Sequence, residues 1–187
     1  MIYLDNAATT LRKPPQVIDA VARAMGSFGN SARGTHEGAL TASRTIYNTR
    51  CKLAALFGCP RPDHVVFTAN STEALNIAIN GLVRPGDHVL VSSMEHNAVM
   101  RPLLRLPEVS VSRLPCDSEG FADIAALPGL LRDNTKLVVM AHGSNVCGTV
   151  QDAEAIGRIC ADRGVPFALD AAQTAGHLPI DFSALHL

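Results

Sequence analysis

Four polar segments of the chain each follow an apolar stretch that is typical of a buried strand. They contain hydroxyl, amide, imidazole and carboxylate side chains, in TANSTE at 68–73, SMEHN at 93–97, HGSNVCGT at 142–149 and DAAQTAGH at 170–177. Ligands of open α/β sheets bind outside the carboxyl ends of the strands, so we expect these segments to open on one edge. Together they could hold an anion, a flat ring and a cationic group.

The first polar segment runs directly into an expected helix at 71–81. Asn70 or Ser71 is a suitable N-cap, and Glu73 is spaced to close a capping box. The hydroxyls of Ser71 and Thr72, the free N–H groups and the helix dipole could all bind one phosphate. The alternative is an ordinary capped helix that binds nothing. The glycine patterns of dinucleotide and nucleoside triphosphate sites are absent from the sequence, which argues against a nucleotide-binding Rossmann domain.

Three further side chains follow the other strands. The ring of His96 could stack on an aromatic cofactor, although an isolated loop histidine is more often solvated. Asn145 could donate a hydrogen bond to an oxyanion, or it could simply occupy a turn. Asp170 ends an apolar strand, where a carboxylate is unfavourable without a metal, an arginine or a protonated ring nitrogen as its partner. A carboxylate beside a pyridinium nitrogen makes pyridoxal 5′-phosphate an electron sink, and the four features together fit this cofactor.

The elements that must position these residues alternate along the chain. We expect strands at 65–68, 88–93, 109–114, 136–141 and 166–170, and helices at 14–26, 37–57, 71–81, 97–106, 121–132 and 152–163. Apolar strands that alternate with helices predict an α/β domain with a largely parallel sheet flanked by helices. Gly164 is placed to cap the last of these helices.

The composition narrows the class of protein. Hydrophobic residues make up 47% and charged residues 18% of the 187 residues, as in globular domains, and the net charge of −1 favours neither nucleic acid nor a membrane as a partner. The five cysteines are odd in number and lack CxxC spacing, so we expect no disulfide framework and no metal site. Each cysteine is interpreted as a small apolar side chain. The start lacks the pattern of a signal peptide, and a reducing, cytoplasmic location is expected.

Six segments, in order along nearly the whole chain, resemble the cysteine desulfurases of the class V aminotransferase group, which are fold type I enzymes that use pyridoxal phosphate. They are YLDNAATT at 3–10, GNSARGTH at 29–36, TANSTEALN at 68–76, SMEHNA at 93–98, SNVCGT at 144–149 and LDAAQTAGH at 169–177. Six segments in register are specific for the superfamily and less specific for the subfamily. The resemblance implies a three-layer sheet domain, the large domain of a pyridoxal-phosphate-dependent transferase. It also implies an N-terminal helix and active-site loop over 1–36 and a partial, incomplete large domain over 37–187.

The resemblance further implies roles for individual residues. Ser71 and Thr72 would hold the phosphate, and His96 would stack on the pyridine ring and assist proton transfer as the catalytic residue. The other implied contacts are Asn145 and Gln173 to the phenolic oxygen, Asp170 to the pyridinium nitrogen, and Asn6 and His36 near the substrate.

Two residues depart from the pattern of this family. Asn70 replaces a glycine or another small residue, and Cys147 stands where an aliphatic residue is common. We interpret Cys147 as a packing substitution and not as the sulfur-accepting thiol. The implied reaction converts L-cysteine to L-alanine and leaves a persulfide on the enzyme, for transfer to an acceptor protein in iron–sulfur cluster assembly. Relatives of this kind are homodimers.

The chain has three lysines, Lys13, Lys52 and Lys136, and none is placed to form a Schiff base with the cofactor. In the family this lysine lies on the strand after the Asp-x-x-Gln loop, so we expect an N-terminal fragment that lacks the lysine and the small C-terminal domain and is inactive alone. The strand at 65–68 would then be poorly paired in a monomer, or paired with another chain. Two alternatives remain: another class V enzyme (a selenocysteine lyase, an epimerase or an aminotransferase), or a non-catalytic interaction domain that retains the cofactor cradle.

Overall fold

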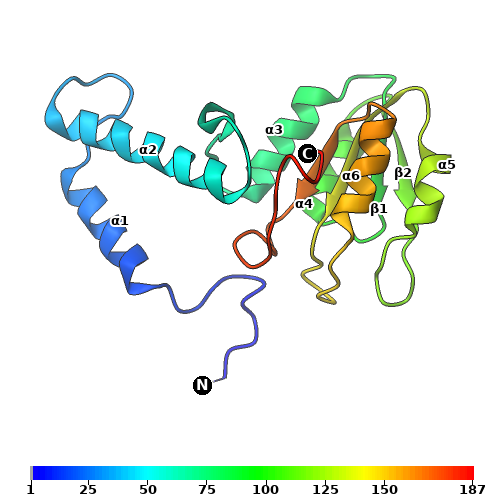
Figure 1. Cartoon of the computed structure of the whole chain (residues 1–187), viewed down its shortest axis with the longest axis horizontal. Coiled ribbons are helices and arrows are strands. Elements are labelled where there is room, and N and C mark those ends of the chain that lie inside the picture. The colour runs from blue at the N-terminus through cyan, green and yellow to red at the C-terminus, as the bar shows by residue number, and fades with distance from the viewer. Residues whose placement is uncertain (1) are drawn as a thin grey trace. The chain divides into compact units, whose positions relative to one another are not determined.

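A computed structural model describes residues 2–187, and the chain divides into two compact units between Val66 and Phe67 (Figure 1). The sequence suggested a division at residue 36 instead. The helix α2 (Glu37–Leu56) contacts the short 3-10 helix η1 (Pro62–His64), which places it with the N-terminal elements. The functional division into an active-site segment and a partial large domain stays a prediction.

The second unit contains a four-stranded, all-parallel sheet. Its strands are β1 (His88–Ser92), β2 (Ser110–Leu114), β3 (Thr135–Ala141) and β4 (Phe167–Asp170), in the spatial order β2-β1-β3-β4. The predicted α/β class with a largely parallel sheet is therefore confirmed.

The strand predicted at 65–68 is not formed, in agreement with the expectation that this segment is poorly paired in a monomer. These residues belong to no strand of the described chain, and the side chain of Val66 is 72% exposed. The segment follows the short helix η1 and pairs with no described strand, so its local preference for extended backbone does not produce a strand.

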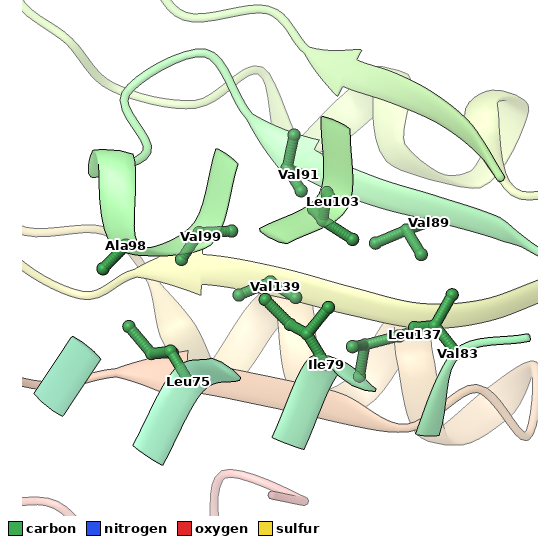
Figure 2. Packing of buried hydrophobic residues seen from close by; sticks show 10 residues of the cluster. All are labelled: Leu75, Ile79, Val83, Val89, Val91, Ala98, Val99, Leu103, Leu137 and Val139. Atoms are coloured by element: carbon green, nitrogen blue, oxygen red, sulfur yellow. The ribbon is translucent and has the colours of Figure 1, made fainter. Parts of the chain in front are cut away.

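Both faces of the sheet are covered, because successive strand residues point to opposite sides. Val89, Val91, Leu137 and Val139 join one buried cluster with α3 (Ser71–Leu82) and α4 (Asn97–Arg105), as Figure 2 shows. Leu90, Val138 and Met140 join the other cluster with α5 (Leu127–Leu130) and α6 (Ala153–Asp162). Each fully buried aliphatic side chain contributes roughly 1.5–3 kcal/mol, so these clusters hold the three layers together.

The helix predicted at 121–132 is shorter than expected. Only η2 (Ile124–Ala126) and α5 are helical there, and α5 has the sequence LPGL. Pro128 lacks an N–H and Gly129 has a high conformational entropy to lose, so the segment cannot continue as a regular helix. Gly164 follows α6 with φ +64°, and its predicted role as the capping residue is confirmed.

The first unit contains α1 (Pro15–Ser27), α2 and η1. The loop at 29–36 folds closely around the ring of His36, because a Cβ atom added at Gly29 would lie 2.6 Å from His36 Cε1. Glycine at this position therefore permits the close approach of backbone and ring. Among residues 2–187, no helix has both the length and the apolar character that a membrane crossing requires.

Candidate functional site

The strand order creates a switch point between β1 and β3. From β1 the chain moves to β2 on one side and later to β3 on the other. The helices that follow β1 and β3, α4 and α6, cover opposite faces of the sheet. The two connections therefore diverge above the carboxyl ends of these strands, which is where open α/β sheets bind ligands.

Side-chain hydrogen bonds join the loops that follow β1, β3 and β4. Oε1 of Glu95 accepts hydrogen bonds from the Ser92 hydroxyl at 2.5 Å and from the Ala141 N–H at 2.9 Å. Nδ1 of His142 lies 2.9 Å from the Thr174 hydroxyl oxygen. The segments at 93–97, 142–149 and 170–177 therefore form one continuous edge, as the sequence predicted.

The N-terminus of α3 is capped as predicted. Asn70 Oδ1 accepts a hydrogen bond from the Glu73 N–H at 2.9 Å, while Glu73 Oε2 accepts one from the Ala69 N–H at 2.6 Å. This is a capping box whose returning bond reaches one residue before the N-cap. Within residues 2–187, the exposed Ser71 and Thr72 hydroxyls make no hydrogen bond. Two hydroxyls at a helix N-terminus are thus available to an anion.

The N-termini of α3 and α4 lie at the same end of their shared core. In Figure 2, Leu75 and Ala98 lie at the end of the cluster toward which β3 points, and Val83 and Leu137 lie at the other end. The Ser71 and Thr72 hydroxyls at the start of α3 and the loop with His96 therefore lie at the same edge, the carboxyl edge of the sheet.

His96 is the N-cap residue of α4. Its Nδ1 accepts a hydrogen bond from the Ala98 N–H at 3.1 Å, so the neutral ring carries its proton on Nε2. The ring is exposed. A capping bond thus fixes a flat, accessible imidazole at the edge.

The loop with Asn145 closes on itself. The Ser144 N–H donates to the Thr149 carbonyl oxygen at 2.9 Å, and Gly148 has φ +76°. Asn145 and Cys147 are exposed between these residues. Cys147 was interpreted as a packing substitution, and this is wrong because its side chain belongs to no buried cluster. Hydrogen bonds to Ser144 and then to Thr149 lower the pKa of the Cys147 thiol to about 7.

Asp170 is the last residue of β4 and is partly buried. Its Oδ1 accepts a hydrogen bond from the Ala172 N–H at 3.0 Å. Gln173 lies in the following turn and is also partly buried. A Cβ atom added at Gly143 would lie 2.8 Å from Thr174 Cγ2, so glycine allows the loops after β3 and β4 to meet.

Glu95 is a residue of this edge that the sequence reasoning missed. Burial raises the pKa of its carboxyl group to about 7, against the opposing effect of the hydrogen bonds from Ser92 and Ala141. A signal was present in the sequence: an acid stands directly before His96 in a segment that follows an apolar strand. It was read as part of a polar loop, and its burial depends on tertiary contacts.

Two predicted substrate residues belong to the other compact unit. Asn6 lies in an exposed turn, where its Oδ1 accepts a hydrogen bond from the Leu11 N–H at 3.4 Å. His36 is the residue before α2 and is exposed. Their roles near the substrate therefore remain predictions.

Lys136 is exposed on the second residue of β3, at the amino end of the strand. It thus lies at the opposite edge of the sheet from the candidate site, as the sequence predicted. Lys13 and Lys52 belong to the first unit.

Comparisons with known proteins identify relatives of the chain. The chain is 38% identical over 98% of its length to a probable cysteine desulfurase of Methanothermobacter thermautotrophicus, and 37% identical over 98% to cysteine desulfurase IscS of Pectobacterium carotovorum. It spans 46% and 47% of those two proteins, which is about half the length of the curated relatives it matches.

Solved structures give the same assignment of the fold. The apo structure of cysteine desulfurase from Thermococcus onnurineus NA1 superposes with a TM-score of 0.91 at 31% identity, over 99% of this chain and 47% of that one. SspA in complex with cysteine superposes with a TM-score of 0.89 at 28% identity, over 99% and 55%. The sequence profile described as Aminotransferase class-V matches residues 2–187. The chain therefore belongs to the class V aminotransferase family.

Proposed function

We propose that the carboxyl edge of this sheet binds pyridoxal 5′-phosphate and that the chain provides this edge to a cysteine desulfurase. The observation that supports it best is the joining of the three loops after β1, β3 and β4 through Glu95 and the His142–Thr174 pair. The loops at this edge carry the exposed ring of His96, the amide groups of Asn145 and Gln173, and the carboxylate of Asp170. The names of the relatives support cysteine as the substrate.

The donor groups fit the cofactor. The Ser71 and Thr72 hydroxyls at the start of α3 would bind the phosphate, where the helix dipole also favours an anion. The His96 ring would stack on the pyridine ring, since its capping bond already fixes the orientation of the imidazole. The remaining assignments are Asn145 and Gln173 to the phenolic oxygen and Asp170 to the ring nitrogen.

The carboxylate of Asp170 would keep the bound ring nitrogen protonated, and in that state the cofactor supplies an electron sink. The Nε2–H of His96 would hold a proton beside the ring and could deliver it there. The proposed overall reaction removes sulfur from L-cysteine and releases L-alanine. We further propose a homodimeric, cytoplasmic protein that passes the sulfur to an acceptor protein.

Binding of the cofactor tests the proposal. We expect the chain to change the absorbance spectrum of added pyridoxal phosphate, and Asp170→Asn to weaken binding by roughly 10- to 100-fold, as the loss of a charged hydrogen bond does. Asp162→Asn, at an exposed carboxylate on the last residue of α6, is the matched control and should bind as the unaltered chain does.

Phosphate dependence provides the second arm of the test. Pyridoxal without its phosphate should compete poorly if the start of α3 binds the phosphate. Equal binding of both compounds, or equal affinity of the Asp170→Asn variant and the unaltered chain, would contradict the proposed site.

A further inference from the structure

Glu95 occupies the switch point of the sheet, between the carboxyl ends of β1 and β3. Its Oε1 accepts the Ser92 hydroxyl at 2.5 Å and the Ala141 N–H at 2.9 Å, so one carboxyl oxygen joins the last residues of two adjacent strands. Ser92 Oγ in turn accepts the Met94 N–H at 3.1 Å. The loop that leads to His96 is therefore held both at Met94 and at Glu95.

The other carboxyl oxygen of Glu95 is in a different situation. Among the described residues, Oε2 is one of the few buried side-chain atoms that have no hydrogen-bond partner. An ionised carboxylate would leave a charged oxygen unsatisfied there, which is unfavourable in a buried site. The neutral acid is favoured, because an unpaired neutral hydroxyl costs less in a buried site than an unpaired charged oxygen, and Oε1 can still accept both hydrogen bonds.

The charged and titratable groups around Glu95 act in the same direction. The charge of the Asp170 carboxylate at the end of β4 raises the pKa of Glu95, and a charge on Glu95 in turn raises the pKa of the Cys116 thiol after β2. Burial makes the largest contribution and raises the pKa of Glu95 to about 7. A neutral Glu95 leaves Asp170 as the carboxylate that is free to meet a cation at this edge.

We propose that Glu95 is a positioning residue of the cofactor site, which holds the His96 loop against the end of β3 so that the imidazole and Asp170 keep a fixed separation. The inference rests on the proposed function of this edge. His96 follows Glu95 directly and caps α4 through the Ala98 N–H, so a shift of the Glu95 backbone moves the ring. In this role Glu95 acts through the position of His96 relative to Asp170.

Two substitutions separate positioning from simple burial. Glu95→Gln retains an oxygen that can accept both hydrogen bonds and removes the ionisation, whereas Glu95→Ala removes the side-chain link between the last residues of β1 and β3. We expect Glu95→Ala to weaken pyridoxal phosphate binding by about tenfold or more, because the Ala141 N–H loses its partner and the loop is released. Glu95→Gln should stay within about threefold of the unaltered chain at pH 7. Glu154→Gln, at an exposed glutamate of α6, is the matched control.

The pH profile supplies a readout that a purely structural role would not change. Above pH 7 the affinity of the unaltered chain should fall relative to that of Glu95→Gln, because ionisation places a charged, unpaired Oε2 in a buried position near Asp170. Parallel profiles for the two proteins would overturn the inference, and this comparison decides even if Glu95→Ala does not fold.

A measurement without cofactor separates this inference from the proposed function. Amide hydrogen exchange of Ala98, whose N–H binds His96, should be faster by about tenfold in Glu95→Ala and unchanged in Glu95→Gln. Unchanged exchange in Glu95→Ala would show that Glu95 does not hold the His96 loop. An unaltered chain that binds no pyridoxal phosphate, with the exchange result as expected, would count against the proposed function alone.

Discussion

The two edges of the sheet each bury a histidine that is hydrogen-bonded to a threonine hydroxyl. At the amino edge, His88 Nδ1 lies 2.8 Å from Thr135 Oγ1, and at the carboxyl edge, His142 Nδ1 lies 2.9 Å from Thr174 Oγ1. All four residues are buried. The chemistry of the pair is the same, so any difference in its role must come from the surroundings.

The two histidine–threonine pairs connect different segments of the chain. Thr135 Oγ1 also accepts the Arg132 N–H at 2.7 Å, and the pair closes the turn that enters β3 against the start of β1. Thr174 joins the loop after β4 to the loop after β3, where Asn145 and Asp170 lie. The comparison indicates that one buried pair stabilises the entry to the strands, whereas the other places loops that carry the candidate site.

The largest effect is expected at the amino edge. Thr135→Val should lower the free energy of unfolding by about 2 kcal/mol, because His88 Nδ1 and the Arg132 N–H both lose a buried partner. Urea denaturation measures the change. The affinity for pyridoxal phosphate should not change, since this edge lies opposite the candidate site, and a loss of affinity would break the comparison.

The matched substitution at the carboxyl edge should behave in the opposite way. Thr174→Val removes one hydrogen bond and should lower the free energy of unfolding by about 1 kcal/mol. It should weaken cofactor binding by about tenfold, because the loop with Asp170 and Gln173 loses its attachment to the loop with Asn145. Equal affinities of the Thr174→Val and Thr135→Val variants would show that both pairs are purely structural.

Helix caps allow the same comparison at a smaller scale. The side chains of Asn70 and Asp152 each accept a backbone N–H at 2.9 Å, from Glu73 at the start of α3 and from Ala155 at the start of α6. Alanine at either position should cost about 1 kcal/mol of stability. Only Asn70→Ala should also weaken binding of inorganic phosphate, followed by NMR shifts of the Ser71 and Thr72 amides. A similar loss with Asp152→Ala would contradict a phosphate site at α3.

Local signals predicted the elements that carry this edge. The capping box at Asn70 and Glu73, the glycine after α6 and the alternation of apolar strands with helices all act over a few residues, and they placed α3, α6 and the four strands within one or two residues. A local signal alone was not enough at 65–68, where a strand was predicted and none forms. The extended preference of this segment is local, but a strand needs a neighbour that no local signal supplies.

The buried polar groups could not be predicted in this way. Glu95 is polar in sequence and lies in a loop, and its burial follows from the approach of β3, whose Ala141 is 46 residues away in the chain. The pairing of His142 with Thr174 spans 32 residues for the same reason. The prediction for Cys147 was wrong in the opposite direction. Relatives commonly have an aliphatic residue at this position, so a packed side chain was expected, but the Cys147 thiol is exposed.

The smallest net effect is expected in the pH dependence of stability, where the buried histidines of both edges oppose Glu95 at the carboxyl edge. Burial lowers the pKa of His88, with a smaller contribution from the charge of Arg132, and burial also lowers the pKa of His142. The unfolded chain then binds more protons as the pH falls below about 6.5, so these histidines remove stability toward acid. Glu95, with a pKa raised from 4.5 to about 7, acts in the opposite direction, because the folded chain keeps its proton while the unfolded chain has released it.

As the pH rises from 5 to 7, the contribution of Glu95 to the free energy of unfolding decreases. The contribution of the two histidines increases over part of that range, so the two changes offset each other. Each group can contribute a slope of at most about 1.4 kcal/mol per pH unit, and the unaltered chain should show a shallow net dependence. Glu95→Gln removes one of the opposing slopes, so its free energy of unfolding, measured by urea denaturation, should rise more steeply from pH 5 to 7. Identical slopes in the two proteins would mean that Glu95 does not hold its proton in the folded state, and the carboxyl edge would then differ from the amino edge in its loops alone.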